Sequence, residues 1–307
     1  MQHYRSLEEV HLHKAWLTIG QFDGVHRGHQ EIIRKLTAGA HTVQAPVVVV
    51  TFFPPPAVVL GKRIKPSYLT TPDERAILLG DLGVDIVITH PFDSQVALTS
   101  AKEFMSILKD KLGLECLMVG YDFALGRDRT GDVASLTSLG KQLGYSVKAI
   151  PPVKIDTEII SSSLIRKALS AGQVERAASF LGRPYRISGE VVPGDGRGTT
   201  IGIPTANLNV WSSRAVPASG VYACQALVDG DAHAAVTNIG VRPTFDPKSD
   251  LIWVEVHLLD FNETIYGKVI QLDFKARLRD EQRFPDIQTL VDQIHQDIFH
   301  ARNILNQ

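Results

Sequence analysis

The sequence predicts an α/β domain with a doubly wound parallel sheet, followed by an antiparallel β-barrel that ends in a helix. The 307 residues are about twice the roughly 150 of a typical domain, so two domains are expected. The first part of the chain alternates continuous apolar runs with helical patterns, and the second part alternates apolar and polar residues. We place the boundary near Gly182-Arg183-Pro184, giving domains of residues 1–182 and 183–307.

The elements of the first domain follow from period and capping. Continuous apolar runs at 15–19, 47–52, 84–89 and 114–119 predict strands covered on both faces. Thr71-Pro72-Asp73-Glu74, and Ser100 with Glu103 three residues later, are typical helix starts. The second of these helices is expected to bury one face, formed by Phe104, Ile107, Leu108 and Leu112. A helical pair at 162–171 and 173–181 precedes the boundary.

Alternation with a period of two marks the strands of the second domain, most clearly at 252–258 and 269–278. Gly and Pro residues at 193–204, 217–220 and 240–247 separate these strands, and a closed or nearly closed barrel would remove exposed edges. An apolar helical stripe then ends the chain, at Ile287, Leu290, Val291, Ile294 and Ile298.

Composition narrows the class of protein. Hydrophobic residues make up 44% and charged residues 21%, which excludes a disordered chain. No apolar run reaches the ~18 residues that cross a bilayer, and 32 basic residues balance 33 acidic ones. Cys116 and Cys224 lie in apolar runs, which favours buried thiols in a reducing compartment. We expect a cytoplasmic protein with small-molecule substrates, no nucleic-acid or membrane partner, and at most weak homo-oligomerisation.

The segment Gly20-Gln21-Phe22-Asp23-Gly24-Val25-His26-Arg27-Gly28-His29 follows the first strand directly and opens a helix. Glycines allow close backbone approach and a helix start supplies free N–H groups, so the turn favours phosphate. His26 and His29 can share one side of it and stabilise charge during phosphoryl or nucleotidyl transfer. A lone His there would be a capping or surface residue, but the HxGH pattern favours function. Zinc is less expected, because no further Cys or His pair has ligand spacing.

Two further segments of the first domain can complete such a site. Gly120-Tyr121-Asp122-Phe123 leaves a buried strand, where open α/β sheets bind ligands. Ile160-Ser161-Ser162-Ser163-Leu164-Ile165-Arg166 opens a helix; alone, its serines indicate a cap and Arg166 a solvated face. Combined with HxGH, they predict the far wall of a triphosphate site.

In the second domain, a glycine loop at 194–202 leads into Pro204-Thr205-Ala206-Asn207. Such a loop can line phosphates, although many glycine loops are ordinary turns. Thr205 and Asn207 lie two residues apart on an extended segment, so both oxygens can face one Mg²⁺. Glu255 alternates with Val254 and Val256 and is either a general base or a solvated strand residue.

These motifs together resemble the prokaryotic bifunctional riboflavin kinase/FMN adenylyltransferase (FAD synthetase) family over nearly the whole chain. The resemblance rests on segments Thr18 to His29, Ile160 to Arg166, Pro204 to Asn207, Gly240 to Phe245, Glu255 to Phe261 and Leu278 to Phe284. It implies that the second domain phosphorylates riboflavin with ATP to FMN. It also implies that the first, a Rossmann-like nucleotidyltransferase domain, transfers AMP from a second ATP to FMN, giving FAD and pyrophosphate.

The resemblance assigns site residues by motif. Catalytic roles go to Glu255, as the base, and to His26 and His29; Thr205 and Asn207 go to Mg²⁺-ATP. Adenylyltransferase ATP contacts are expected at Gly20, Phe22, Asp23, Gly24, His26, His29, Ser162, Ser163 and Arg166, and FMN contacts at Pro54, Pro56, Asp122 and Phe123. Kinase ATP or flavin contacts are expected at Gly194, Gly196, Arg197, Gly198, Thr205, Asn207 and Arg279.

The sequence departs from the family pattern at four positions outside these assignments. Phe53 and Pro55 stand in a segment that commonly reads TFEPHP, Thr199 replaces a frequent Arg, and Ile203 a frequent Phe. Two alternatives stay open: a single-activity nucleotidyltransferase whose barrel only binds flavin, and a flavin-sensing protein without turnover.

Overall fold

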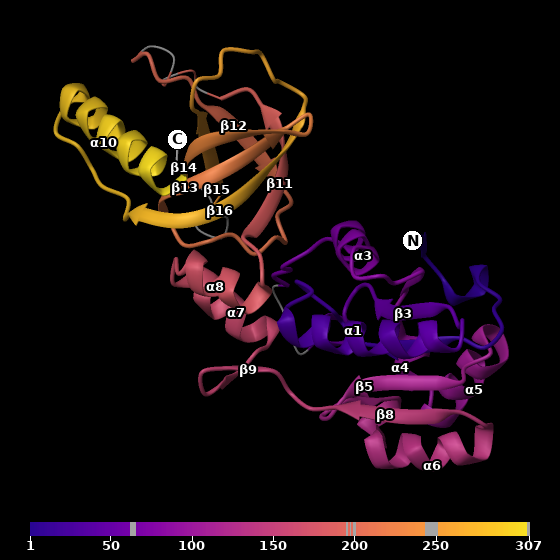
Figure 1. Cartoon of the computed structure of the whole chain (residues 1–307). Helices are drawn as coiled ribbons and strands as arrows, with labels where there is room; N and C mark the ends of the chain where they lie inside the picture. Colours follow the sequence, from indigo (N-terminus) through magenta and orange to yellow (C-terminus); the bar gives the residue numbers. More distant parts are fainter. Residues whose placement is uncertain (62–65, 195, 197, 199–200, 243–250, 306–307) are drawn as a thin grey trace. The chain divides into compact units, whose positions relative to one another are not determined.

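The chain forms two compact units, Met1–Ser162 and Ser163–Gln307, and each is described by itself (Figure 1). The computed structural model describes residues 1–61, 66–194, 196, 198, 201–242 and 251–305. Within this part of the chain, no helix combines the length and apolar character needed to span a membrane.

The first unit is built on a six-stranded sheet whose strand pairs are all parallel. Its strands, in spatial order, are β1 (Gln2–Tyr4), β4 (Ile86–His90), β3 (Val47–Phe52), β2 (Trp16–Ile19), β5 (Cys116–Gly120) and β8 (Ser146–Ile150). The chain moves outward from β2 through β3 to β4, then returns to the other side of β2 for β5 and β8. This confirms the doubly wound parallel sheet, with the strand order reversing between β2 and β5. The sequence did not predict β1.

Helices cover both faces of this sheet: α1 (Arg27–Thr42) and α3 (Pro72–Gly80) pack on one face, and α5 (Ala101–Leu112) and α6 (Val133–Leu143) on the other. The short helices α2 (Pro56–Val59) and α4 (Ser94–Leu98) have no buried residues. Neighbouring residues of β3 belong to different apolar clusters, Val48 to the one containing α5 and Val47 to the one containing α1, so both faces of the strand are buried. Short elements complete the unit: η1 (Leu7–Glu9), η2 (Arg127–Arg129), β6 (Ala124–Leu125), β7 (Gly131–Asp132), β9 (Lys154–Ile155) and β10 (Glu158–Ile159).

The capping signals read from the sequence are confirmed. The side chains of Thr71 and Ser100 each accept a hydrogen bond from the backbone N–H of a glutamate three residues on. The carboxylate of that glutamate in turn accepts from the backbone N–H of the capping residue. One expectation for α5 is wrong, because Ile107 is 38% exposed. The buried face of α5 follows i, i+4 spacing through Phe104, Leu108 and Leu112, and Ile107 lies on its flank.

The second unit contains a closed antiparallel barrel, as predicted. Around it run β11 (Tyr185–Val192), β12 (Ala206–Val210), β15 (Leu251–Leu258), β14 (Asp231–Arg242), β13 (Gly220–Val228) and β16 (Val269–Arg279), which pairs again with β11. Val254 and Val256 are buried on one face of β15. On the other face of the barrel wall, Val221 and Val236 form an apolar cluster with Ala301 of α10 (Ile287–Leu305).

The predicted stripe of α10 is only partly buried. Ile287, the first residue of the predicted stripe, is 66% exposed, whereas Ala301, which the stripe did not include, is fully buried. The physical reason is that the early turns of α10 do not reach the apolar cluster: Leu290 and Ile294 line a cavity beside the barrel instead.

Both cysteines are free and buried, as expected. Burial raises the pKa of the Cys224 thiol to about 12, so it stays protonated and unreactive at neutral pH.

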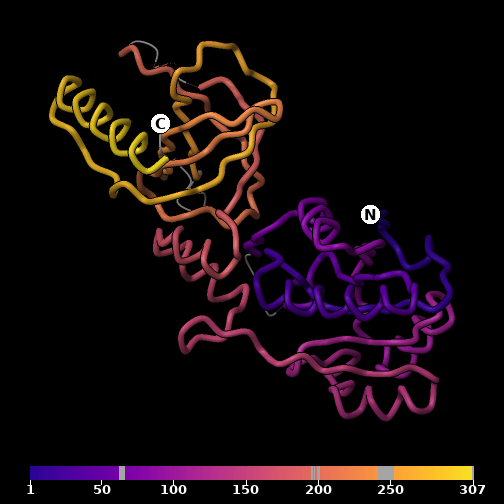
Figure 2. Tube along the Cα trace, viewed as in Figure 1, coloured from indigo at the N-terminus to yellow at the C-terminus, as the bar shows by residue number. Residues whose placement is uncertain are grey.

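A helical pair, α7 (Ser162–Ser170) and α8 (Val174–Leu181), leads into the barrel, and the chain trace can be followed through it in Figure 2. α8 packs on β11 and β16 with Val174, Ala177 and Phe180 buried. The backbone N–H of Arg277 donates to Glu175 Oε1 at 3.2 Å. The helical pair therefore packs with the barrel, although the predicted domain boundary places it before the second domain.

This packing predicts how far a fragment can be shortened. A fragment of residues 163–307 is expected to unfold at a higher temperature than one of 183–307, because the shorter fragment exposes the surface that Val174, Ala177 and Phe180 cover. Burying each large apolar side chain contributes about 1.5–3 kcal/mol. Thermal unfolding followed by circular dichroism measures the difference. Equal midpoints for the two fragments would show that the barrel does not depend on α8.

Candidate active sites

The glycine turn lies where the strand order of the first unit reverses. It follows β2, and Gly120 ends the neighbouring β5, so both chain segments leave the sheet at the same edge. Pro54 and Pro56 follow β3, the other neighbour of β2. The sheet therefore gathers three of the predicted segments at the position where open α/β sheets bind ligands.

Asp23 holds the glycine turn in place. Its buried carboxylate accepts from the backbone N–H groups of Leu69, at 3.0 Å, and Thr70, at 3.1 Å, and from the Thr70 hydroxyl at 3.2 Å. The N–H of Gly24 donates back to Thr70 Oγ1 at 3.1 Å. These bonds stabilise a backbone in which Phe22, Gly24 and Val25 all have positive φ. The hydrogen bonds of the Asp23 side chain hold the turn in place. A contact between Asp23 and ATP remains a prediction.

Arg75 is a charged residue of this region that the sequence interpretation did not single out. It is completely buried, its Nη1 donates to Thr51 Oγ1 at 3.1 Å, and its Nη2 lies 3.9 Å from Asp23 Oδ1. Thr51 in turn donates to the carbonyl of Gln21 at 3.2 Å. Arg75 lies four residues before Leu79 in α3, so both side chains point to the same, buried face of the helix. A cation on an otherwise apolar helix face was therefore the sequence signal that could have identified Arg75.

His26 and His29 lie together at the start of α1. His26 is the N-cap, and its Nδ1 accepts from the N–H of His29 at 3.3 Å, which places the proton of a neutral His26 on Nε2. The two rings stack with centroids 3.6 Å apart, and Phe22 packs edge-on against His29 with centroids 5.0 Å apart. Both imidazoles are thus held at a helix N-terminus, where N–H groups and the helix dipole favour an anion.

The environment of His29 sets its charge. Burial is the largest cause that lowers the pKa of His29 well below its ordinary value of 6.5, and electrostatic repulsion between a protonated His29 and its neighbours His26 and Arg75 lowers it further. Its ring is therefore neutral at pH 7. Its Nδ1 is buried and has no hydrogen-bond partner among the residues that the structure describes. A neutral imidazole can donate one hydrogen bond to a phosphate oxygen without a proton transfer.

The remaining predicted residues of this site divide into three groups. Ser162 donates its hydroxyl to the carbonyl of Asp23 at 2.8 Å and so adjoins the turn. Pro54 and Asp122 are exposed, while Phe123 packs partly against the core cluster. Ser163 and Arg166 are described within the second unit, and their place at the phosphates stays a prediction.

The second unit has a cavity of about 420 Å³ between the barrel wall and α10. Six of the residues predicted for the kinase line this cavity: Gly196, Gly198, Thr205, Asn207, Glu255 and Arg279. Arg197 lies outside the described residues. Asn238, His257 and Glu281 also line the cavity, and the sequence interpretation did not select them.

Antiparallel pairing aligns three polar residues across this wall. Glu255 of β15 is paired with Asn207 of β12 on one side and with Asn238 of β14 on the other. Asn207 is 7% exposed, and within the described part of the chain its Oδ1 has no hydrogen-bond partner. An unsatisfied amide oxygen beside a carboxylate fits an oxygen-seeking cation such as Mg²⁺.

Two glycines bring their loop close to this row. A Cβ on Gly194 would lie 1.9 Å from Asn207 Nδ2, and one on Gly198 would lie 2.3 Å from the carbonyl of Ile203 and 3.1 Å from Thr205 Oγ1. A larger residue at Gly194 would displace the Asn207 side chain, and one at Gly198 would displace the backbone at Ile203. These glycines therefore permit close approach to the proposed ligands.

Arg279 joins the barrel to α10. Its Nε and Nη2 bind the carboxylate of Asp297 at 3.0 and 2.8 Å, and its guanidinium lies 5.7 Å from the ring centre of Phe284. Asp297 is almost fully buried. This bidentate pair forms one wall of the cavity, and breaking such a buried pair typically costs about 3–5 kcal/mol.

Comparison with known proteins identifies both halves of the chain. Residues 8–164 match the FAD synthetase family and residues 181–305 match the riboflavin kinase family. A bifunctional riboflavin kinase/FMN adenylyltransferase of Pseudomonas fluorescens is 40% identical over 93% of this chain and 91% of its own length. The chain belongs to the bifunctional riboflavin kinase/FMN adenylyltransferase family. A Haemophilus influenzae relative with the same name is 36% identical over 100% of both chains.

A solved structure has the same fold as this family member. The crystal structure of a protein from Streptococcus pneumoniae, described as a macrolide-efflux protein, is 31% identical, has a TM-score of 0.89 and covers 98% of each chain. The efflux description belongs to that protein. For this chain, the two family matches and the curated relatives agree on flavin chemistry.

In this family member, a metal ion in the cavity would have few protein ligands. Among the described residues, no group of three or more His, Cys, Asp and Glu side chains could hold an ion. The predicted ligands Thr205 and Asn207 are of none of these types, and Mg²⁺ that is bound with nucleotides commonly takes phosphate oxygens as further ligands.

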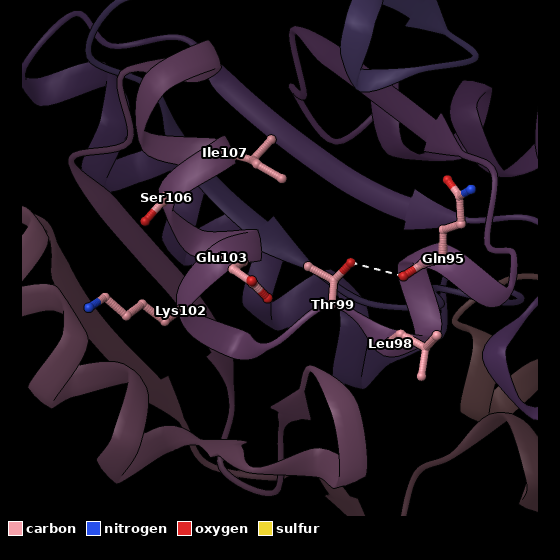
Figure 3. Close-up of a pocket in the computed structure, with 7 residues that line it drawn as sticks. All are labelled: Gln95, Leu98, Thr99, Lys102, Glu103, Ser106 and Ile107. Atoms are coloured by element: carbon pink, nitrogen blue, oxygen red, sulfur yellow. Dashed lines mark hydrogen bonds between the residues drawn. The ribbon is translucent and has the colours of Figure 1, made fainter.

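A separate hollow of about 660 Å³ lies along α4 and α5 (Figure 3). It contains none of the predicted site residues and is lined by Gln95, Leu98, Thr99, Lys102, Glu103, Ser106 and Ile107. Its Thr99 hydroxyl donates to the carbonyl of Gln95 at 3.0 Å, and Glu103 is engaged in the cap of α5. The partial exposure of Ile107 results from its position in this hollow.

The lowered pKa of His29 predicts a pH dependence of stability. The folded state disfavours the protonated ring, so its contribution is fully present above pH 6.5 and is lost as the pH falls below that value. The free energy of unfolding is expected to fall more between pH 7 and pH 5 in the wild type than in His29→Gln. Urea unfolding at both pH values measures this. An identical pH dependence in the two proteins would contradict a buried neutral His29.

Proposed function

We propose that this protein makes FAD from riboflavin in two ATP-dependent steps. The second unit would phosphorylate riboflavin to FMN, and the first would transfer AMP to FMN. The observation that carries this proposal is that residues of each motif set lie together. His26 and His29 stack at the sheet edge, and Asn207 and Glu255 are paired in the wall of the cavity beside α10.

In the kinase step, the riboflavin hydroxyl attacks the terminal phosphorus of ATP, and ADP leaves. Glu255 would accept the hydroxyl proton, and its position in the cavity lining beside Asn207 supports this role. Thr205 and Asn207 would hold Mg²⁺, which supplies charge neutralisation at the phosphates when bound. Arg279 forms the cavity wall next to α10 through its pair with Asp297. The guanidinium N–H groups that do not bind Asp297 can donate hydrogen bonds to substrate.

In the adenylylation step, a phosphate oxygen of FMN attacks the α-phosphorus of ATP, and pyrophosphate leaves. The chain needs no nucleophile of its own and acts by positioning and charge stabilisation. His26 and His29 would donate hydrogen bonds to the phosphates from the start of α1. Asp23 and Arg75 would keep the turn in the conformation that presents them.

Several wider assignments belong to this proposal. We assign the kinase to residues 183–307 and the adenylyltransferase to residues 1–182. The helical pair that precedes residue 183 packs on the barrel and would stabilise the kinase domain. We further propose a cytoplasmic protein, small-molecule substrates and at most weak self-association. Purified protein incubated with riboflavin, ATP and Mg²⁺ tests the two activities together when the flavins are separated by chromatography. Unchanged riboflavin, with FAD formed only when FMN is supplied, would indicate a single-activity nucleotidyltransferase. Turnover of neither riboflavin nor supplied FMN would indicate a flavin sensor.

The first substitution tests the base. Glu255→Gln keeps the shape of the side chain without its basicity, so riboflavin phosphorylation is expected to fall about 10²- to 10⁴-fold. FAD formation from supplied FMN should stay at the wild-type rate. Glu190→Gln, the same change on an exposed position of β11, is the matched control. Near-normal FMN production by Glu255→Gln would remove Glu255 from the mechanism.

The second substitution tests the other site. His29→Ala is expected to slow FAD formation on the order of 10²-fold, because a hydrogen bond to the developing charge is lost, while FMN accumulates. His41→Ala, at an exposed position of the same helix, is the control. The measurement is the FAD-to-FMN ratio over time. Equal loss of both activities would indicate misfolding, and unchanged FAD formation would exclude a catalytic role for His29.

A further inference from the structure

The segment that carries Thr205 has little support from the neighbouring strand. β12 pairs with β15 at two positions only, Ala206 with Val256 and Asn207 with Glu255. If the same register continued towards the start of β12, Thr205 would lie opposite His257. The next residue in that direction is Pro204. Proline has no N–H to donate, so backbone pairing cannot extend fully through this segment. The approach to the proposed ligands must be held in another way.

The side chain of His257 makes the missing connection. Its Nδ1 lies 2.7 Å from the carbonyl oxygen of Pro204, across 53 residues of sequence. A carbonyl oxygen can only accept, so Nδ1 carries a proton and donates it to this bond. The hydrogen bond therefore continues the contact between β15 and the segment before β12 by one further step.

His257 also lies on the face of β15 that carries Glu255. The two residues are separated by one buried valine, Val256, and both line the cavity with Thr205 and Asn207. The segment is also held by Gly198 of the glycine loop, because the N–H of Ile203 donates to the carbonyl of Gly198 at 2.9 Å. His257 and Gly198 thus both restrain the segment that precedes Thr205.

We propose that His257 is a positioning residue of the kinase site: its hydrogen bond to Pro204 sets where Thr205 and Asn207 present their oxygens to Mg²⁺-ATP. This rests on the proposed kinase function. His257 needs no contact with substrate to do this, and the bond orders one short segment rather than the barrel as a whole.

The test compares His257→Leu with His257→Asn in the full chain. Leu removes the donor, whereas the Asn amide nitrogen is attached in the position of the His Nδ1 and can restore the bond. His257→Leu is expected to raise the KM for Mg²⁺-ATP, and the Mg²⁺ concentration giving half-maximal rate, by about three- to tenfold. The KM for riboflavin should change less, and His257→Asn should resemble the wild type.

His257→Gln keeps the proposal testable if the Leu variant does not fold. Its amide is of similar polarity but lies one carbon further out, so it should behave like Leu and not like Asn. Equal Mg²⁺-ATP parameters for the Asn and Gln variants would overturn the proposal. A parallel rise in the KM values for riboflavin and Mg²⁺-ATP would also overturn it, because that pattern indicates general loosening of the cavity.

FMN adenylylation by the same chain is the internal control. It uses the other unit and should keep its wild-type rate in all three variants. The wild-type protein separates the two hypotheses: if it does not phosphorylate riboflavin, the proposed function fails. If it does, and His257→Leu has unchanged Mg²⁺ dependence, only the positioning role fails.

Discussion

The buried carboxylate of Asp23 is the constraint on which the first site depends. A buried carboxylate is costly unless donors surround it, and here they come from Leu69, Thr70 and the nearby guanidinium of Arg75. Satisfying it ties the turn after β2 to the segment before α3. That connection maintains a backbone with several positive φ angles, and α1 then starts at His26 with the two imidazoles stacked. The chemistry of the site thus depends on residues that need not contact substrate.

In the second site, strand register positions the polar side chains. Antiparallel pairing places Asn207, Glu255 and Asn238 side by side on three strands. The Arg279–Asp297 pair fixes α10 as the opposite wall, while His257 holds the ligand segment where proline interrupts the ladder. In both units, polar groups are positioned by backbone and buried pairs before any substrate arrives.

Local signals predicted most of the fold correctly because they depend on neighbours in sequence. Thr71 and Ser100 initiate helices through bonds that span three residues, and apolar runs such as 47–52 form strands covered on both faces. The errors arose where burial depends on distant partners. Ile107 and Ile287 have helical spacing, but a stripe does not specify how far the opposing surface extends. β1 has no apolar run and forms by pairing with β4 at the sheet edge.

The sequence by itself determined the family motifs, the parallel and antiparallel character of the two sheets, and the candidate residues His26, His29 and Glu255. Only the tertiary structure decided that Arg75 lies beneath the glycine turn, that Asn238 lies beside Glu255, and that His257 reaches Pro204. The physical reason is that motifs and periodicity are properties of adjacent residues. Register, burial and hydrogen bonds between distant segments exist only after the strands and helices have packed.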